Sequence, residues 1–75
     1  MTIGEAAKRA METGGWMFRE CEGWRLCVKP TDGFDCCKVM TIEPEGNKRP
    51  EGRRWNPRGC DLVANDWGVL LEEMA

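Results

Sequence analysis

A change in hydrophobic periodicity at Gly14-Gly15 divides the sequence into a helical and an extended part. From Ile3 to Met11 the apolar residues recur every three or four positions, which is the spacing of one helix face. Thr2 can cap this segment together with Glu5, and the two glycines can end it. We therefore predict an N-terminal helix, and because its apolar face is mostly alanine, this helix can lie close against a sheet.

Beyond the glycines the apolar residues alternate as they do in strands. Trp24, Leu26 and Val28 occupy every second position, so they share one face of a strand. Three further strands are expected, at residues 16–20, 34–43 and 68–71.

Turn-forming residues separate these strands. A bend is expected around Glu22-Gly23 and a turn over residues 30–33, because proline presets φ and glycine accepts a positive φ. Residues 44–53 contain no aliphatic side chain and predict a solvated loop. Asp61 is expected to be the N-cap of a short helical turn before the last strand. The sequence predicts a single domain over residues 1–75 of the α+β class, in which an N-terminal helix packs on a small antiparallel sheet.

The small size of the chain limits how it can be stabilised. A domain of 75 residues buries only about 60% of the surface that its unfolded chain exposes, so disulfides, a metal or self-association usually add to its core. The five cysteines are an odd number, and the chain has no histidine and no C-x-x-C motif, which disfavours both disulfides and zinc. Self-association is the remaining expectation.

The sequence also bears on location. No segment approaches the roughly 20 apolar residues of a membrane span, and the first residues do not resemble an apolar signal segment. We therefore expect no membrane association and an intracellular, reducing environment in which the cysteines remain free.

Net charge and its distribution constrain the partners. The formal net charge is −2, which excludes a generic nucleic-acid binder, and no nucleic-acid polymer is expected as a partner. The basic residues are nevertheless clustered, at Lys48, Arg49, Arg53, Arg54 and Arg58. A local anion site is therefore compatible with an acidic chain.

The segment RRWNPRGCDLVANDW, residues 53–67, combines aromatic, cationic and acidic side chains. Indole faces stack on nucleobases, guanidinium groups bind phosphates, and carboxylate or amide oxygens accept from ribose hydroxyls. Trp67 follows a helical turn and is expected in the core rather than at a ligand. The candidate ligand-binding residues are Trp24, Arg25, Arg53, Arg54, Trp55, Pro57, Asp61 and Asn65.

Catalysis is not expected. A hydrolytic site without histidine needs paired carboxylates or an activated cysteine, but Glu72 and Glu73 are adjacent and splayed. No cysteine has an obvious basic partner that would favour the thiolate. The sequence therefore predicts a protein without catalytic residues, bound metal or cofactor.

Two patches resemble a known family. One is the opening Ile3-Gly4-Glu5-Ala6-Ala7, and the other is Trp55-x-Pro57 followed by Asp61-Leu62-Val63-Ala64-x-Asp66-Trp67. Both are similar in order and spacing to the second type of phage Thoeris anti-defence proteins. Arg58 replaces the serine that usually follows the proline, and the turn before Trp24 lacks the usual asparagine.

The resemblance implies a sponge for immune signals. Members of this family bind glycocyclic ADP-ribose signals made by TIR enzymes, and some also bind cyclic dinucleotides, without cleaving them. They form homotetramers with ligand pockets at subunit interfaces. The resemblance thus implies a bacteriophage protein that acts in the cytoplasm of the infected bacterial host and blocks activation of the defence effector.

Two other functions are compatible with the same residues. A small single-stranded nucleic-acid binding module would use the same tryptophans and arginines, although the net charge of −2 counts against it. A protein inhibitor that docks on a host effector is the second alternative.

Overall fold

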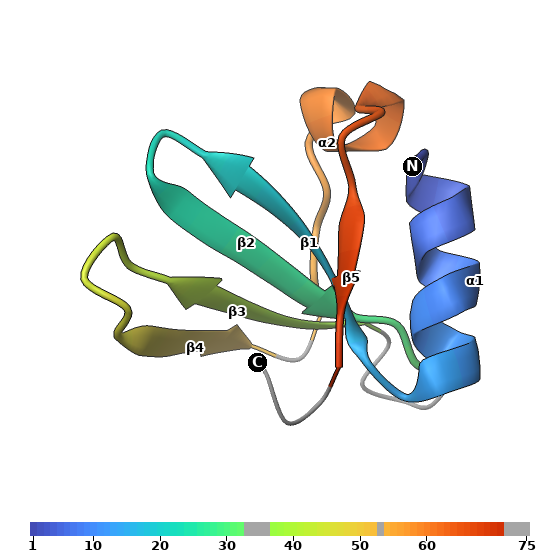
Figure 1. Ribbon diagram of the computed structural model, residues 1–75, viewed down its shortest axis with the longest axis horizontal. Coiled ribbons are helices and arrows are strands. Elements are labelled where there is room, and N and C mark those ends of the chain that lie inside the picture. Colours follow the sequence, from blue (N-terminus) through green and yellow to red (C-terminus); the bar gives the residue numbers. More distant parts are fainter. Residues whose placement is uncertain (33–36, 53, 72–75) are drawn as a thin grey trace.

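The computed structural model describes residues 1–32, 37–52 and 54–71 and confirms the predicted α+β class (Figure 1). Helix α1 packs on an antiparallel five-stranded sheet with the strand order β4-β3-β2-β1-β5. The helices are α1 (Ile3–Thr13) and α2 (Gly59–Val63), and the strands are β1 (Trp16–Cys21), β2 (Trp24–Lys29), β3 (Lys38–Ile42), β4 (Lys48–Gly52) and β5 (Gly68–Leu70).

Local sequence signals set both ends of α1. The Thr2 hydroxyl oxygen accepts the Glu5 amide at 3.2 Å, and the Glu5 carboxylate accepts the Thr2 amide at 2.9 Å, which is the predicted capping box. Gly14 ends the helix in the left-handed conformation with φ 69°. Ala6 and Ala10 are fully buried, as expected for a helix whose small side chains allow close contact with a sheet.

The bend between β1 and β2 forms where the sequence predicts it. Glu22 and Gly23 have φ values of 53° and 87°, and the flanking residues Cys21 and Trp24 are paired across the hairpin. Two central residues with positive φ match the tight hairpin turn whose twist suits antiparallel strands. This turn fixes the register that places Arg19 opposite Leu26.

The prediction that residues 44–53 form only a loop is wrong, because β4 lies within them. The backbone of β4 pairs with the edge of β3, with Lys48 opposite Ile42 and Pro50 opposite Met40. Main-chain pairing at a sheet edge needs no aliphatic side chain, and a proline without an N–H group is tolerated there. The return strand β3 is described from Lys38, so the first part of the predicted strand 34–43 lies outside the described residues.

The two faces of the sheet differ in what covers them. On one face α1 encloses a core of buried side chains, Ala6, Ala10, Met17, Val28 and Trp67. The other face, called here the open face, carries Cys27, Met40 and Leu70 with the partly buried Trp16, Phe18 and Ile42. All residues of this second cluster come from strands. Among the described residues no helix side chain belongs to it.

The helices of the described ranges are short. Neither α1 nor α2 is long and apolar enough to cross a membrane.

Candidate functional site

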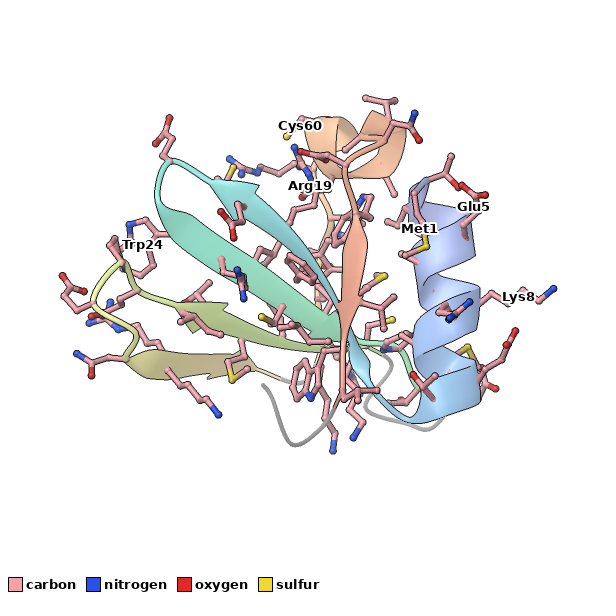
Figure 2. All side chains as sticks on the ribbon, viewed as in Figure 1. Met1, Glu5, Lys8, Arg19, Trp24 and Cys60 are labelled. Atoms are coloured by element: carbon pink, nitrogen blue, oxygen red, sulfur yellow. The ribbon has the colours of Figure 1, made fainter. Side chains whose placement is uncertain are left out.

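A pocket of about 450 Å³ opens on the face of the sheet that α1 partly covers. Its floor comes from the first three strands, with Cys21 on β1, Trp24 and Leu26 on β2, and Val39 and Thr41 on β3. These positions share one face because the strand register sets Cys21 opposite Trp24 and Leu26 opposite Thr41. The floor is therefore largely apolar and has an indole at its outer end, away from α1 (Figure 2).

The segment before α2 forms the wall of the pocket. Arg54, Trp55, Asn56 and Arg58 line it, and Arg54 and Arg58 are exposed at the rim. The amide of Trp55 donates to the carbonyl of Cys37 at 2.9 Å, which fastens the start of this wall next to β3. The pocket thus combines an apolar floor with a cationic rim.

Two tryptophans stabilise the wall from behind. The rings of Trp55 and Trp67 meet edge to face, with centroids 6.0 Å apart and an interplanar angle of 79°. Such aromatic pairs contribute about 0.5–1.5 kcal/mol beyond the area that they bury. Trp67 is only 2% exposed, which confirms its predicted place in the core. Trp55 also contacts this core while it lines the pocket.

Arg19 and Asp61 form the inner corner of the pocket, and the exposed Asp66, which does not line the pocket, also binds Arg19. Arg19 Nη1 donates to Asp61 Oδ1 at 2.9 Å, and Arg19 Nε donates to Asp66 Oδ1 at 3.0 Å. The guanidinium carbon lies 5.8 Å from the centroid of Trp67. Figure 2 shows Arg19 extending toward α2, which carries Cys60. This one side chain therefore ties β1 to the segment that contains α2.

Its acidic partners keep Arg19 charged. Burial by itself lowers the pKa of Arg19, but the hydrogen bond and charge of Asp66 and the hydrogen bond to Asp61 outweigh it, so the pKa is raised above its ordinary value. Arg19 is therefore a permanent cation, and its charge is already paired with the carboxylates of Asp61 and Asp66.

Asp61 does not have the predicted role of an N-cap. The N-cap of α2 is Arg58, and Asp61 is the third helical residue, whose Oδ2 accepts the Arg58 amide at 2.9 Å. The backbone carbonyl of Asp61 accepts the indole N–H of Trp67 at 3.0 Å. Asp61 is 3% exposed, and each of its carboxylate oxygens has a protein partner. Asp61 therefore has a structural role at the pocket, because protein hydrogen bonds already occupy both of its carboxylate oxygens.

The structure brings four of the eight predicted site residues together at the pocket, Trp24, Arg54, Trp55 and Asp61. Arg25 lies on the open face, where its guanidinium carbon is 4.7 Å from the Phe18 ring centroid and where it pairs with Glu20. Pro57 and Asn65 are exposed and do not line the pocket. Arg53 lies outside the described residues.

The sequence-based reasoning missed several lining residues. Leu26 shares the strand face of Trp24 by alternation, whereas Arg19, Val39 and Thr41 reach the pocket only through the strand register, which single-sequence periodicity does not specify. Arg58 belongs to the basic cluster recognised in the sequence, and its place at the rim depends on the fold of the wall.

Potential metal ligands are not grouped in the described residues. Within residues 1–32, 37–52 and 54–71 no three potential ligands of the His, Cys, Asp or Glu type are grouped to hold a metal ion. Cys21 lines the pocket floor, whereas burial raises the pKa of Cys27 on the opposite face and keeps that thiol protonated.

Comparison with known proteins places the chain in a family. No curated protein and no solved structure matches it. The model of one domain family, the Thoeris anti-defense 2-like (Tad2-like) domain, matches residues 1–70 and so includes α1, the whole sheet and the pocket wall. This protein therefore belongs to the Thoeris anti-defense 2-like family.

Proposed function

We propose that this protein is a phage sponge that binds ring-closed nucleotide immune signals and holds them intact. The ligands are glycocyclic ADP-ribose and, in the same chemical class, cyclic dinucleotides. Sequestration in the cytoplasm of the infected bacterium would keep the signal from its effector. The observation that carries the proposal is a single pocket that combines Trp24 and Trp55 with Arg54 and Arg58 at its rim.

The pocket suits this class of ligand in size and chemistry. Its volume of about 450 Å³ lies within the usual range of small-molecule sites, roughly 300–1,000 Å³. An indole at the floor and another in the wall offer faces for a purine, and Leu26 and Val39 add apolar contact. The rim arginines can bind phosphate oxygens, and Asn56 and Thr41 carry polar groups suited to ribose hydroxyls.

The required affinity is within reach of these groups. Holding a signal at nanomolar concentration takes about 12 kcal/mol. Stacking contributes about 1–3 kcal/mol per base, and a charge-assisted hydrogen bond about 1.5–3 kcal/mol. Two stacks and a few such bonds reach this value, since a cyclic ligand is already partly ordered and loses less entropy on binding.

We also propose that the active form is a homo-oligomer, with a tetramer favoured. A chain of 75 residues has a marginal core, and its open face presents Trp16, Phe18 and Ile42 only partly buried. A second copy that packs on this face would bury these side chains, and a tetramer needs a further interface, at which the ligand pocket would lie, as the family resemblance implies.

Binding without turnover is tested by recovery of the ligand. Glycocyclic ADP-ribose is incubated with excess protein, the free fraction is measured by equilibrium dialysis, and the boiled sample is separated by liquid chromatography. We expect the free ligand to fall and intact ligand to return after boiling. A product peak would identify an enzyme instead, and a ligand that stays free in solution would refute the sponge.

Paired arginine variants test where the ligand binds. Arg54→Met removes a rim guanidinium and is expected to weaken binding about tenfold or more, the loss of one charge-assisted contact. Arg25→Met removes a guanidinium from the open face and is the matched control, for which we expect unchanged affinity. Equal losses in both variants would contradict the assignment of the pocket.

One observation favours a second candidate function, single-stranded nucleic-acid binding. The open face carries the basic residues Arg25, Lys29, Lys38 and Lys48 beside the rings of Trp16 and Phe18, and Glu20 pairs with Arg25 there. The net charge of −2 counts against this function. Filter binding with random single-stranded RNA at physiological salt distinguishes the two, since the sponge predicts no retention.

A further inference from the structure

The Asp61 carboxylate connects a buried cation to the backbone of a rim residue. Its Oδ1 accepts from Arg19 Nη1 and its Oδ2 accepts from the Arg58 amide, both at 2.9 Å. Asp61 is 3% exposed and the Arg19 side chain 14% exposed, so water weakens these contacts little. A displacement of Arg19 would therefore be transmitted through Asp61 to Arg58.

Charge balance makes the corner itself a poor phosphate site. Arg19 carries one positive charge and contacts two carboxylates, those of Asp61 and Asp66. The Asp61 carboxylate, which is only 4% exposed, by itself offsets the charge of Arg19, so the corner offers no net positive charge to a phosphate. Arg54 and Arg58 are exposed at the rim, and their guanidinium groups make no ion pair within the part of the chain that the structure describes.

We infer that Arg19 is a positioning residue, which supports ligand binding by holding Arg58 in place through Asp61 and does not itself bind the phosphate. The inference rests on the proposed function for its effect on affinity, although the contacts among the three residues exist without ligand. Arg54 provides the contrast, because its part of the wall is held by the hydrogen bond from the Trp55 amide to Cys37.

The first test needs no ligand. In nitrogen–proton correlation spectra, the Arg58 amide and the Trp67 indole N–H both report on Asp61, the first through the carboxylate and the second through the backbone carbonyl. We expect Arg19→Met to shift both signals, while Arg54→Met leaves them in place. If Arg19→Met leaves the Arg58 amide unchanged, the inference is overturned regardless of what the protein binds.

The second test is a pair of double-mutant cycles with glycocyclic ADP-ribose as the probe. In the wild-type background we expect Arg58→Met to weaken binding about tenfold or more. In the Arg19→Met background the same change should cost less than about threefold, because Arg58 is already displaced. Arg54→Met should cost nearly the same in both backgrounds. A general loosening of the fold would instead reduce the contributions of both arginines alike.

Variants that fail to fold do not block the test. If Arg19→Met does not fold, Arg19→Lys replaces it, since an ammonium keeps the charge but cannot reach Asp61 and Asp66 together in the fork geometry of a guanidinium. The same shift of the Arg58 amide and the same reduced cost of Arg58→Met are expected, at smaller size. Full additivity of Arg19 and Arg58 variants would overturn the inference. Absence of any binding in the wild type would refute the proposed function alone, and the spectra would still decide the role of Arg19.

Discussion

At the scale of single residues, the polar contacts of the pocket join positions that are distant in the chain. Arg19 meets Asp61 and Asp66, which lie 42 and 47 positions further along. Breaking such a pair by removing one partner leaves a charge in a poorly hydrated place, and typically costs about 3–5 kcal/mol when the pair is fully buried. Arg19 is partly exposed, so a smaller cost is expected here. Steric contacts of single atoms also affect the stability of the fold, as at Gly15.

Gly15→Ala is expected to destabilise the protein. A methyl group built on Gly15, between α1 and β1, would lie 2.3 Å from the backbone carbonyl oxygen of Leu70, which cannot move without disturbing β5. Overpacking of this kind costs about 1–3 kcal/mol. Urea unfolding followed by circular dichroism measures the change. Gly4→Ala is the control, because nothing lies within 4 Å of its added methyl group, and a stability equal to or above wild type is expected. An unchanged midpoint for Gly15→Ala would show that β5 can move away.

At the scale of elements, α1 depends on local signals and α2 on distant ones. The capping box of α1 lies between residues three positions apart, Thr2 and Glu5, whereas α2 spans only five residues and is held by Arg19 of β1. A helix that short is not stable alone. This difference predicts that α1 responds to changes within itself and that α2 responds to changes in the sheet.

The stability contribution of Glu5 is expected to depend on pH. Hydrogen bonds from the Thr2 amide and hydroxyl lower the pKa of Glu5 below its ordinary value in the folded state. A lowered folded pKa means that the stabilisation is present above the unfolded pKa and disappears as pH falls through the folded one. The wild type should therefore be more stable than Glu5→Gln near pH 7, and the two unfolding midpoints should converge in acid below about pH 4. A difference that stays constant with pH would contradict this cause.

At the scale of the whole molecule, α1 covers one face of the sheet, and within the described residues no helix covers the other. Cys27, Met40 and Leu70 are buried beneath the aromatic and aliphatic side chains of the open face, and a raised pKa keeps the Cys27 thiol protonated. Trp16, Phe18 and Ile42 remain only partly buried on this face, and contact with another protein surface would bury them further. Self-association through this face would also add buried apolar surface to a protein whose own core is small.

Oligomerisation is expected to be sensitive to charge on the open face. Light scattering coupled to size exclusion should give the wild type a mass that is a multiple of the 8.5 kDa chain. Ile42→Glu places a charge among the partly buried side chains of this face and should reduce the mass, with circular dichroism as the check on folding. Lys8→Glu, on the exposed side of α1, should leave the mass unchanged. A wild-type monomer at all concentrations would refute the oligomer.

The errors of the sequence-based prediction have physical causes. Arg25 follows Trp24 directly in β2, and adjacent strand residues point to opposite faces, so their separation was readable from the alternation alone. The strand β4 was missed because its pairing with β3 is made by backbone groups. The role of Asp61 was misassigned because α2 begins earlier than predicted, with Arg58 as the N-cap and Asp61 accepting its amide from the third helical position.

The amino-acid sequence by itself determined α1, the tight turn between β1 and β2, and the α+β class, because caps, glycines and alternation act over a few neighbouring residues. It also marked Trp24, Arg54 and Trp55 as candidate site residues, which the structure brings to one pocket. Only the tertiary structure decided which residues form the floor of the pocket and that Arg19 binds Asp61. It also decided which side chains lie on the open face. These features depend on strand register and long-range packing, whose free energy is gained only when distant segments meet.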